Sequence, residues 1–324
     1  MTERKIKKSS LNINPWMVVS FILLAVFALK TLFEADINIK PKFLSQGSKV
    51  ATTQPQPTGQ AGQSASTGQV DLTKLEKDIL PAEGVELPIV WGDLGKQLIT
   101  KGVIDQAKFE TLFAQRGGLK DDEKNLLSGL GNQSIRMTQQ NANFLLDLFW
   151  AFGLANKNDV LDKGEMMRDP KQVGNFASTG GWTLAKSQAT DYYSKFSLVK
   201  LTPEQQALVE KVSQGIYRPC CGNSTHFPDC NHGMAMLGLL ELMAANGVSE
   251  TDMYKKALVV NSFWFPQTYV ELAAYFQEQG KNWNQVDPKE VLGKNYSSAQ
   301  GYQKTRSQIK SLPQPQQGGG GCGA

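Results

Sequence analysis

Apolar positions recur at helical spacing along most of the chain between residues 71 and 312. No long stretch alternates apolar and polar residues as a half-buried strand would. The pattern therefore predicts an all-α fold of short helices separated by glycine and proline. The helices are expected over residues 94–104, 105–115, 121–130, 138–152, 203–216, 231–246, 249–262, 266–280 and 297–309.

Some of these boundaries carry specific sequence signals. Thr202 is a good N-cap, Pro203 fits a first helical turn, and Gln205 completes a capping box with Thr202. Gly247 and Gly280 are placed to end the helices that precede them. We therefore expect the helices around the middle of the chain to begin and end close to these residues.

A different apolar pattern lies near the N-terminus. Residues 13–33 form a nearly continuous apolar stretch of about 20 residues, enough to cross a bilayer as a helix. Residues 1–12 are rich in Lys and Arg, which favours an orientation with this end in the cytoplasm. No small-residue cleavage site follows the stretch, so we expect a single-pass signal-anchor in the cell membrane, and the alternative is a removed signal peptide. In both cases the body is predicted to be extracytoplasmic.

Composition divides the rest of the chain. Residues 44–70 are mostly Gln, Ser, Thr, Gly, Ala and Pro without an aromatic residue, which predicts a disordered linker. Residues 71–200 are expected to form a helical domain of unknown role. Residues 201–312 are expected to form a helical domain with a Cys/His loop. Residues 313–324 form a Gly-rich tail, expected to be flexible, that carries Cys322.

Several function classes find little support in the sequence. The net charge is only +4 and no dense Lys/Arg stripe runs through the body, which argues against nucleic-acid binding. Residues 156–165 lack the spacing of an EF-hand calcium loop. Residues 175–182 are rich in Gly, Ser and Thr but lack the Gly-Lys-Ser/Thr of a phosphate loop. We expect residues 175–182 to line a pocket or to pack over the Cys/His loop.

The chemistry is concentrated in residues 220–232. The chain has four cysteines and two histidines, and this window holds all of them except Cys322. The residues in the window are Cys220, Cys221, His226, Cys230 and His232. Thiols and imidazoles are the commonest soft metal ligands and the commonest redox or proton-handling groups.

A metal site is the first interpretation of this window. Cys220, Cys221 and Cys230 with one histidine, first of all His232 and otherwise His226, would make a tetrahedral Cys3His set. Such a set suits zinc or the softer copper(I) ion. Two adjacent cysteines depart from the usual C-x2-C spacing of zinc sites. The sequence therefore predicts a soft or borderline metal ion as the cofactor.

Two alternatives remain open from the residues alone. Cys221 and Cys230 are candidate catalytic thiols of a thiol–disulfide oxidoreductase, because a helix start and nearby Arg218 both favour the thiolate. Cys322 is then a second candidate for the resolving thiol. The other alternative is a structural interaction module in which Cys230 forms a disulfide with Cys221 or Cys220, as an oxidising compartment permits. The sequence leaves open whether the protein is an enzyme.

The loop also resembles a known family. Residues 218–225 read RPCCGNST and residues 229–231 read DCN, with Ala235 beyond them. This stretch resembles the Cys-x-x-Cys-x-Asn-x-Ser…Asp-Ser-Asn…Ala pattern of the thiol-oxidoreductase family of cytochrome c maturation proteins. The resemblance covers about residues 203–265. Cys221 matches the second cysteine of the pattern, whereas the first falls on Arg218, so Cys220 or Cys230 would have to replace it.

The resemblance implies a three-helix-bundle-like segment, a membrane anchor and an extracytoplasmic thiol pair. It also implies that the partner is another extracytoplasmic or membrane protein, namely an apocytochrome. These are expectations from the family and not from the spacing of the residues.

Overall fold

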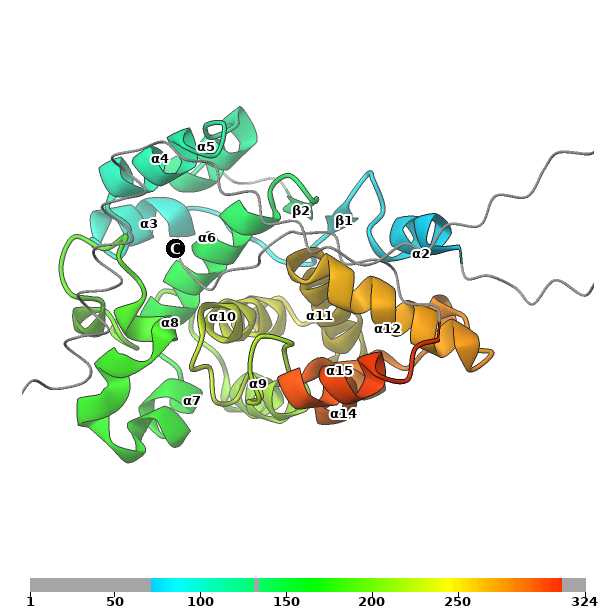
Figure 1. Ribbon diagram of the computed structural model, residues 1–324. Coiled ribbons are helices and arrows are strands. Elements are labelled where there is room, and N and C mark those ends of the chain that lie inside the picture. Colours follow the sequence, from blue (N-terminus) through cyan, green and yellow to red (C-terminus); the bar gives the residue numbers. More distant parts are fainter. Residues whose placement is uncertain (1–70, 131–133, 311–324) are drawn as a thin grey trace, which may run out of the picture. The chain divides into compact units, whose positions relative to one another are not determined.

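The structure, a computed structural model, describes residues 71–130 and 134–310, and all of these belong to one compact unit. This part of the chain is mostly helical (Figure 1), which confirms the all-α expectation. The helices of its first half are α2 (Leu72–Ile79), α3 (Leu94–Thr100), α4 (Gln106–Ala114), α5 (Asp121–Ser128), α6 (Ala142–Ala155), α7 (Asp159–Asp162), η1 (Glu165–Arg168), η2 (Pro170–Asn175), α8 (Ala177–Gly180) and η3 (Ala189–Asp191). Those of its second half are α9 (Pro203–Gly215), α10 (Asn231–Ala245), α11 (Glu250–Trp264), α12 (Pro266–Glu278), η4 (Trp283–Gln285), α13 (Pro288–Leu292), α14 (Lys294–Ser297) and α15 (Ala299–Arg306).

Helices α6 and α10 form the centre of the core. Both are buried along almost their whole length, and they pack against each other at two glycines. A Cβ atom on Gly153 would lie 2.3 Å from the Met234 carbonyl oxygen, and one on Gly238 would lie 2.7 Å from that of Phe149. Only glycine allows two helix backbones to approach this closely. The described residues before and after position 200 therefore share one core, and the start of α10 is held rigidly.

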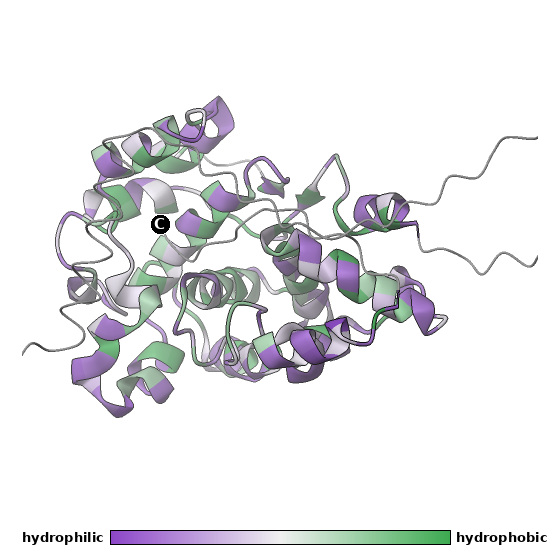
Figure 2. Cartoon of the chain, in the orientation of Figure 1, coloured by the Kyte–Doolittle hydropathy of each residue, from purple (hydrophilic) through white to green (hydrophobic). Residues whose placement is uncertain are grey.

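Other helices cover this pair. Hydrophobic residues run along α6, whereas α5 is largely hydrophilic (Figure 2).

Helix α9 begins with the expected capping box: Thr202 Oγ1 accepts from the Gln205 backbone N–H (3.3 Å), and Gln205 Oε1 accepts from the Thr202 backbone N–H (2.9 Å). Gly247 and Gly280 follow α10 and α12 with φ of 72° and 75°, as expected for helix-ending glycines.

Some expected boundaries are wrong. The expected helix over 138–152 begins only at Ala142, because residues 138–141 form a turn in which the Thr138 N–H donates to Asn141 Oδ1 (2.8 Å). Just before this turn, β2 (Arg136–Met137) pairs antiparallel with β1 (Val85–Glu86), a two-stranded ladder too short to show a period in the sequence. The last expected helix, over 297–309, corresponds to α15: Ser297 instead ends α14, Ser298 caps α15, and the helix ends at Arg306.

Several sequence expectations lie outside the described residues. These are the cytoplasmic segment 1–12, the anchor 13–33, the linker 44–70 and the tail 313–324 with Cys322. Among residues 71–130 and 134–310, no helix has the length and apolar character required to cross a bilayer.

Candidate functional site

The Cys/His loop connects α9 to α10 and is fastened at several points. The Thr225 and His226 N–H groups donate back to the Ile216 and Ser213 carbonyls at 2.7 and 3.1 Å. The Ala299 N–H, far along the sequence at the start of α15, donates to the Cys221 carbonyl at 2.9 Å. The loop is thus tied to α9 and to α15 by backbone hydrogen bonds.

Helix α8 packs on the outer part of the loop. The Ser178 N–H donates to the Asp229 carbonyl (3.0 Å), and the Phe176 and Phe227 rings meet edge to face with their centroids 5.4 Å apart. The expectation that residues 175–182 line a pocket or pack over the loop is therefore confirmed for packing.

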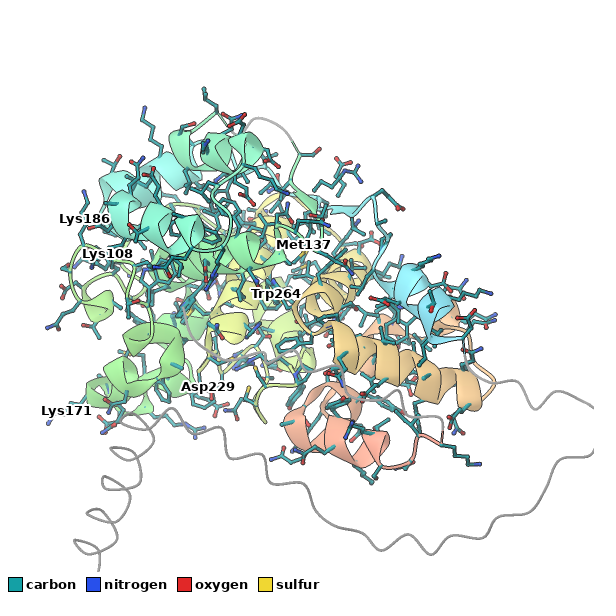
Figure 3. The ribbon with its side chains drawn as sticks, turned by 45° about the horizontal axis from the view of Figure 1, so that its top comes forward. Lys108, Met137, Lys171, Lys186, Asp229 and Trp264 are labelled. Carbon is teal, nitrogen blue, oxygen red and sulfur yellow. The ribbon has the colours of Figure 1, made fainter. Side chains whose placement is uncertain are left out.

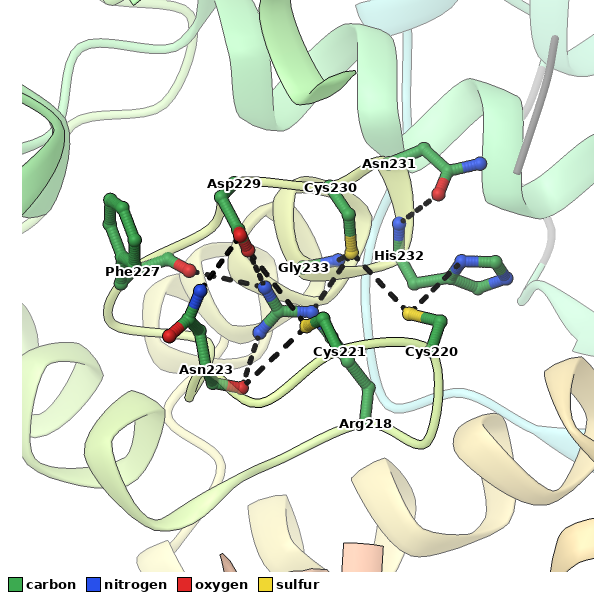
Figure 4. A network of polar contacts seen from close by, with 10 residues as sticks. All are labelled: Arg218, Cys220, Cys221, Asn223, Phe227, Asp229, Cys230, Asn231, His232 and Gly233. Carbon is green, nitrogen blue, oxygen red and sulfur yellow. Dashed lines mark hydrogen bonds and ion pairs between the residues drawn. The ribbon is translucent and has the colours of Figure 1, made fainter. Parts of the chain in front are cut away.

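Arg218 is the hub of the loop, with only 1% of its surface exposed. Its Nε donates to Cys230 Sγ (3.0 Å) and its Nη1 to the Asn223 carbonyl (3.1 Å). Its Nη2 donates to the Phe227 carbonyl (3.1 Å) and forms an ion pair with Asp229 Oδ1 (2.5 Å). One guanidinium therefore holds four points of a loop that has no regular secondary structure (Figure 4).

Two further features fix the guanidinium. Asp229 Oδ2 accepts from Asn223 Nδ2 at 2.7 Å, so both carboxylate oxygens are paired. A Cβ atom on Gly233 would lie 2.6 Å from Arg218 Cζ, so the first turn of α10 leaves space for the guanidinium only because this residue is glycine.

Cys230 lies at the N-cap of α10, where its sulfur accepts from the Gly233 backbone N–H at 3.4 Å. Hydrogen bonds with Cys220 and then Cys221 hold the pKa of the Cys230 thiol well below its ordinary value, and the charge of Arg218 acts in the same direction. The arrangement favours a thiolate at Cys230 although the residue is buried.

Cys220 and His232 lie on one side of Cys230. Cys220 Sγ is 3.6 Å from Cys230 Sγ and 4.0 Å from His232 Nδ1 (Figure 4). All three ligand atoms lie within 4.8 Å of one another. Hydrogen bonding to Cys221 and to Cys230 raises the pKa of the partly exposed Cys220 thiol.

Aromatic rings hold the imidazole in place. The His232 ring centroid is 4.4 Å from that of Phe265 and 5.8 Å from that of Trp264 at the end of α11. Figure 3 labels Trp264, the last residue of α11, together with Asp229 of the loop. The ring packing restricts the orientation of His232, so its Nδ1 stays near the sulfurs.

Cys221 lies on the other side of Cys230. Its sulfur is 3.9 Å from Asp229 Oδ1 and 4.0 Å from the Asn223 carbonyl. A hydrogen bond with Cys220 lowers the pKa of Cys221, but hydrogen bonding to Cys230 and burial outweigh it and raise this pKa to about 11. Cys221, Asp229 and Cys230 form a second group within 4.8 Å, yet the Arg218 guanidinium already pairs with two of its members.

The structure thus divides the predicted ligands. Cys220, Cys230 and His232 converge, Cys221 joins Cys230 on the Asp229 side, and His226 belongs to neither group of ligand atoms. Sequence reasoning noted the charge of Arg218 but missed its burial, and it missed the ring packing on His232. The signal for the buried arginine was Gly233, a glycine in the first turn of an otherwise apolar helix.

Comparisons of the chain with protein-family models, with curated proteins and with solved structures give no match. The chemistry of the site has to be argued from its own residues.

Proposed function

We propose that Cys220, Cys230 and His232 together bind one metal ion, zinc or copper(I). The observation that supports this is the spacing of the ligand atoms. With Zn–S bonds of about 2.3 Å and Zn–N bonds of about 2.0 Å, a tetrahedral site has two sulfurs about 3.8 Å apart and sulfur and nitrogen about 3.5 Å apart. The corresponding distances are 3.6 Å between the sulfurs and 4.0 Å from Cys220 Sγ to His232 Nδ1.

The charges agree with this proposal. Two thiolates, a neutral imidazole and a divalent ion sum to zero, and the adjacent Arg218–Asp229 pair is also neutral. A site of this composition carries no uncompensated charge beside the buried Cys230. Copper(I) leaves one negative charge on the site, which the nearby Arg218 compensates in part.

Cys220, Cys230 and His232 leave one coordination position of a tetrahedral ion to be filled. The Cys3His set expected from the sequence requires Cys221, which lies within 4.8 Å of Cys230 but is turned toward Asp229. A site with three protein ligands keeps one position for water or a substrate, whereas a four-ligand site is closed and structural.

The test is the metal content of the full chain purified without chelator. We expect about one ion per chain, and loss of that ion in Cys220→Ser, Cys230→Ser and His232→Ala. His226→Ala is the matched control, because it removes the other imidazole of the same loop and should keep the ion. Equal metal content in the two histidine variants, or no bound metal in the unaltered chain, would refute the proposal.

The alternative function is thiol–disulfide exchange, which the contact of Arg218 Nε with Cys230 Sγ favours. The Cys230 thiolate would attack a partner disulfide and release one partner sulfur as a thiolate. Cys220, 3.6 Å away, would then displace the second partner sulfur and close a Cys220–Cys230 disulfide. The chain loses two electrons, and the partner gains them. The sequence assigned this role to Cys221 with Cys230, whereas the distances favour Cys220 as the resolving thiol.

The family resemblance supports this alternative, since α9, α10 and α11 follow one another around the loop as a three-helix segment would. It extends the proposal to an apocytochrome partner and to an extracytoplasmic body on the 13–33 anchor. A Cys220→Ser variant should then accumulate a mixed disulfide with oxidised glutathione through Cys230, detectable by mass mapping. Trapping only at Cys221, or at no loop cysteine, would contradict it.

Membrane attachment is tested separately. If residues 13–33 anchor the chain, the protein stays in the membrane fraction after an alkaline wash, and added protease digests the body only from the extracytoplasmic side. Release of the intact chain by the wash would contradict the anchor. The third alternative, a structural interaction module, would require a disulfide from Cys230 to Cys221 or Cys220, and these three cysteines are free in this structure.

A further inference from the structure

A hollow of about 390 Å³ lies between α2, the end of α12 and η4, away from the Cys/His loop. Helices α2 and α12 run beside each other at this end of the domain (Figure 1). Its wall contains one aromatic ring, that of Trp283, and otherwise mainly polar side chains. The volume lies at the lower end of the range for small-molecule sites.

Trp283 differs from every other tryptophan in the described part of the chain. The indole N–H groups of the other four each donate to a backbone carbonyl, from Trp91 to Leu126 (2.9 Å), from Trp150 to Ser178 (2.6 Å), from Trp182 to Val103 (2.8 Å) and from Trp264 to Ala142 (3.2 Å). Trp283 is partly buried, yet its indole N–H has no partner within residues 71–130 and 134–310. This indole N–H is used by no described protein acceptor, so it is available to donate to a ligand.

Two neighbouring aromatic rings hold the Trp283 ring in place. Its centroid lies 6.3 Å from the buried Tyr269 ring and 6.4 Å from the Phe276 ring. Asp71 and Asn282 on the rim cap α2 and η4, which holds the surrounding backbone. The aromatic surface and the rim of the hollow are thus preorganised for a ligand.

Polar side chains with unused hydrogen-bonding capacity surround this ring. The side chains of Lys74, Asp78, Gln277 and Asn284 line the hollow, and none makes a hydrogen bond or an ion pair with another described residue. They supply ammonium, carboxylate and amide groups, so both donors and acceptors face the same space.

The balance of charge selects the class of ligand. Two carboxylates, of Asp71 and Asp78, stand against the single ammonium of Lys74, which disfavours phosphates and other anions. A neutral ligand with one apolar face and hydroxyl groups around its edge fits this hollow. Its apolar face would lie on the Trp283 indole, and its hydroxyl groups would bond to the surrounding amide and carboxylate side chains. We propose that this hollow binds a saccharide, with a sugar ring lying against Trp283. The proposal is independent of the metal site.

The test uses the full chain and three probes: N,N′-diacetylchitobiose, cellobiose and maltose. Binding is followed by the NMR signals of the indole N–H groups. We expect at least one probe to shift the Trp283 signal in a saturable way and to leave those of Trp91, Trp150, Trp182 and Trp264 in place. No shift with any probe up to about 10 mM, ten times a dissociation constant of 1 mM, would overturn the proposal.

Variants separate binding from folding. Asn284→Ala removes an exposed amide at the hollow and should raise the dissociation constant about tenfold. Gln115→Ala, at the exposed C-cap of α4, should leave the dissociation constant unchanged. Trp283→Phe keeps an aromatic ring against Tyr269 but removes the N–H, so the protein should stay folded and bind more weakly. Unchanged affinity in both hollow variants would contradict the proposal.

Discussion

Arg218 explains why a loop without regular structure can hold three thiols and a histidine in place. Its permanently charged guanidinium is almost fully buried and bonds to Cys230, Asn223, Phe227 and Asp229. Its planar fork of donors matches several acceptors at once, which the point charge of lysine does not. The stability of the loop and the placement of Cys230 therefore depend on the same side chain.

Arg218→Lys tests this role. The change keeps the charge but leaves loop acceptors unpaired, so we expect the free energy of unfolding to fall by about 3 kcal/mol. Urea denaturation measures it. Arg136→Lys is the control, because Arg136 is half-exposed and pairs with Glu86 at the surface, where such pairs contribute little. Similar unfolding midpoints for the two variants would contradict the role given to Arg218.

Gly233→Ala tests the space that the guanidinium needs. The new Cβ would lie 2.6 Å from Arg218 Cζ, so the buried side chain must shift and the unfolding free energy should fall by about 1–3 kcal/mol. Gly174→Ala serves for comparison, since its Cβ would meet only a Thr190 methyl at 3.2 Å. If Gly233→Ala were as stable as Gly174→Ala, the Arg218 guanidinium would not be tightly packed against Gly233.

At the scale of elements, the paired core helices each carry a buried carboxyl group. Burial raises the pKa of Glu241 on α10 well above its ordinary value, while Asn156 Nδ2 donates to its Oε2 at 2.5 Å. On α6, burial raises the pKa of Asp147 to about 7, although the charge of Arg116 at 3.6 Å opposes this. Both carboxyls are therefore costly to ionise within the fold.

The Asp147 shift predicts a pH dependence of stability. The folded state keeps the proton up to about pH 7, whereas the unfolded chain loses it near the ordinary value of 3.8. Its contribution is thus fully present below about pH 4 and is lost as the pH rises to about 7. In urea unfolding at a series of pH values, the stability of Asp147→Asn relative to the unaltered chain should rise across this window and then level off.

The matched control is Asp121→Asn, whose side chain is 97% exposed and should show no such trend. Parallel stability curves for Asp147→Asn and the unaltered chain would mean that folding does not raise the pKa of Asp147.

Much of the element structure could be predicted from the sequence. Capping signals placed the start of α9, and glycines marked the ends of α10 and α12, because these signals act within a few residues. The late start of α6 was missed, since a hydrogen bond from the Thr138 N–H to the Asn141 side chain holds a turn there and overrides the apolar pattern.

At the scale of the whole molecule, the site depends on contacts between distant parts of the sequence. Ser178 on α8 and Ala299 on α15 both bond to the loop backbone, and Trp264 and Phe265 pack on His232. The sequence located the cysteines and histidines but not these contacts, because periodicity says nothing about which helices meet. For the same reason it preferred His232 to His226 without a contact to support the choice, and it did not separate Cys221 from Cys220.

The central claim is that Cys220, Cys230 and His232 are ligands of one ion. X-ray absorption of the zinc-loaded chain tests it most directly. We predict two sulfurs at about 2.3 Å and one imidazole nitrogen at about 2.0 Å, with the nitrogen lost in His232→Ala and kept in His226→Ala. An ion surrounded only by oxygen and nitrogen, or one that keeps its imidazole in His232→Ala, would contradict the claim.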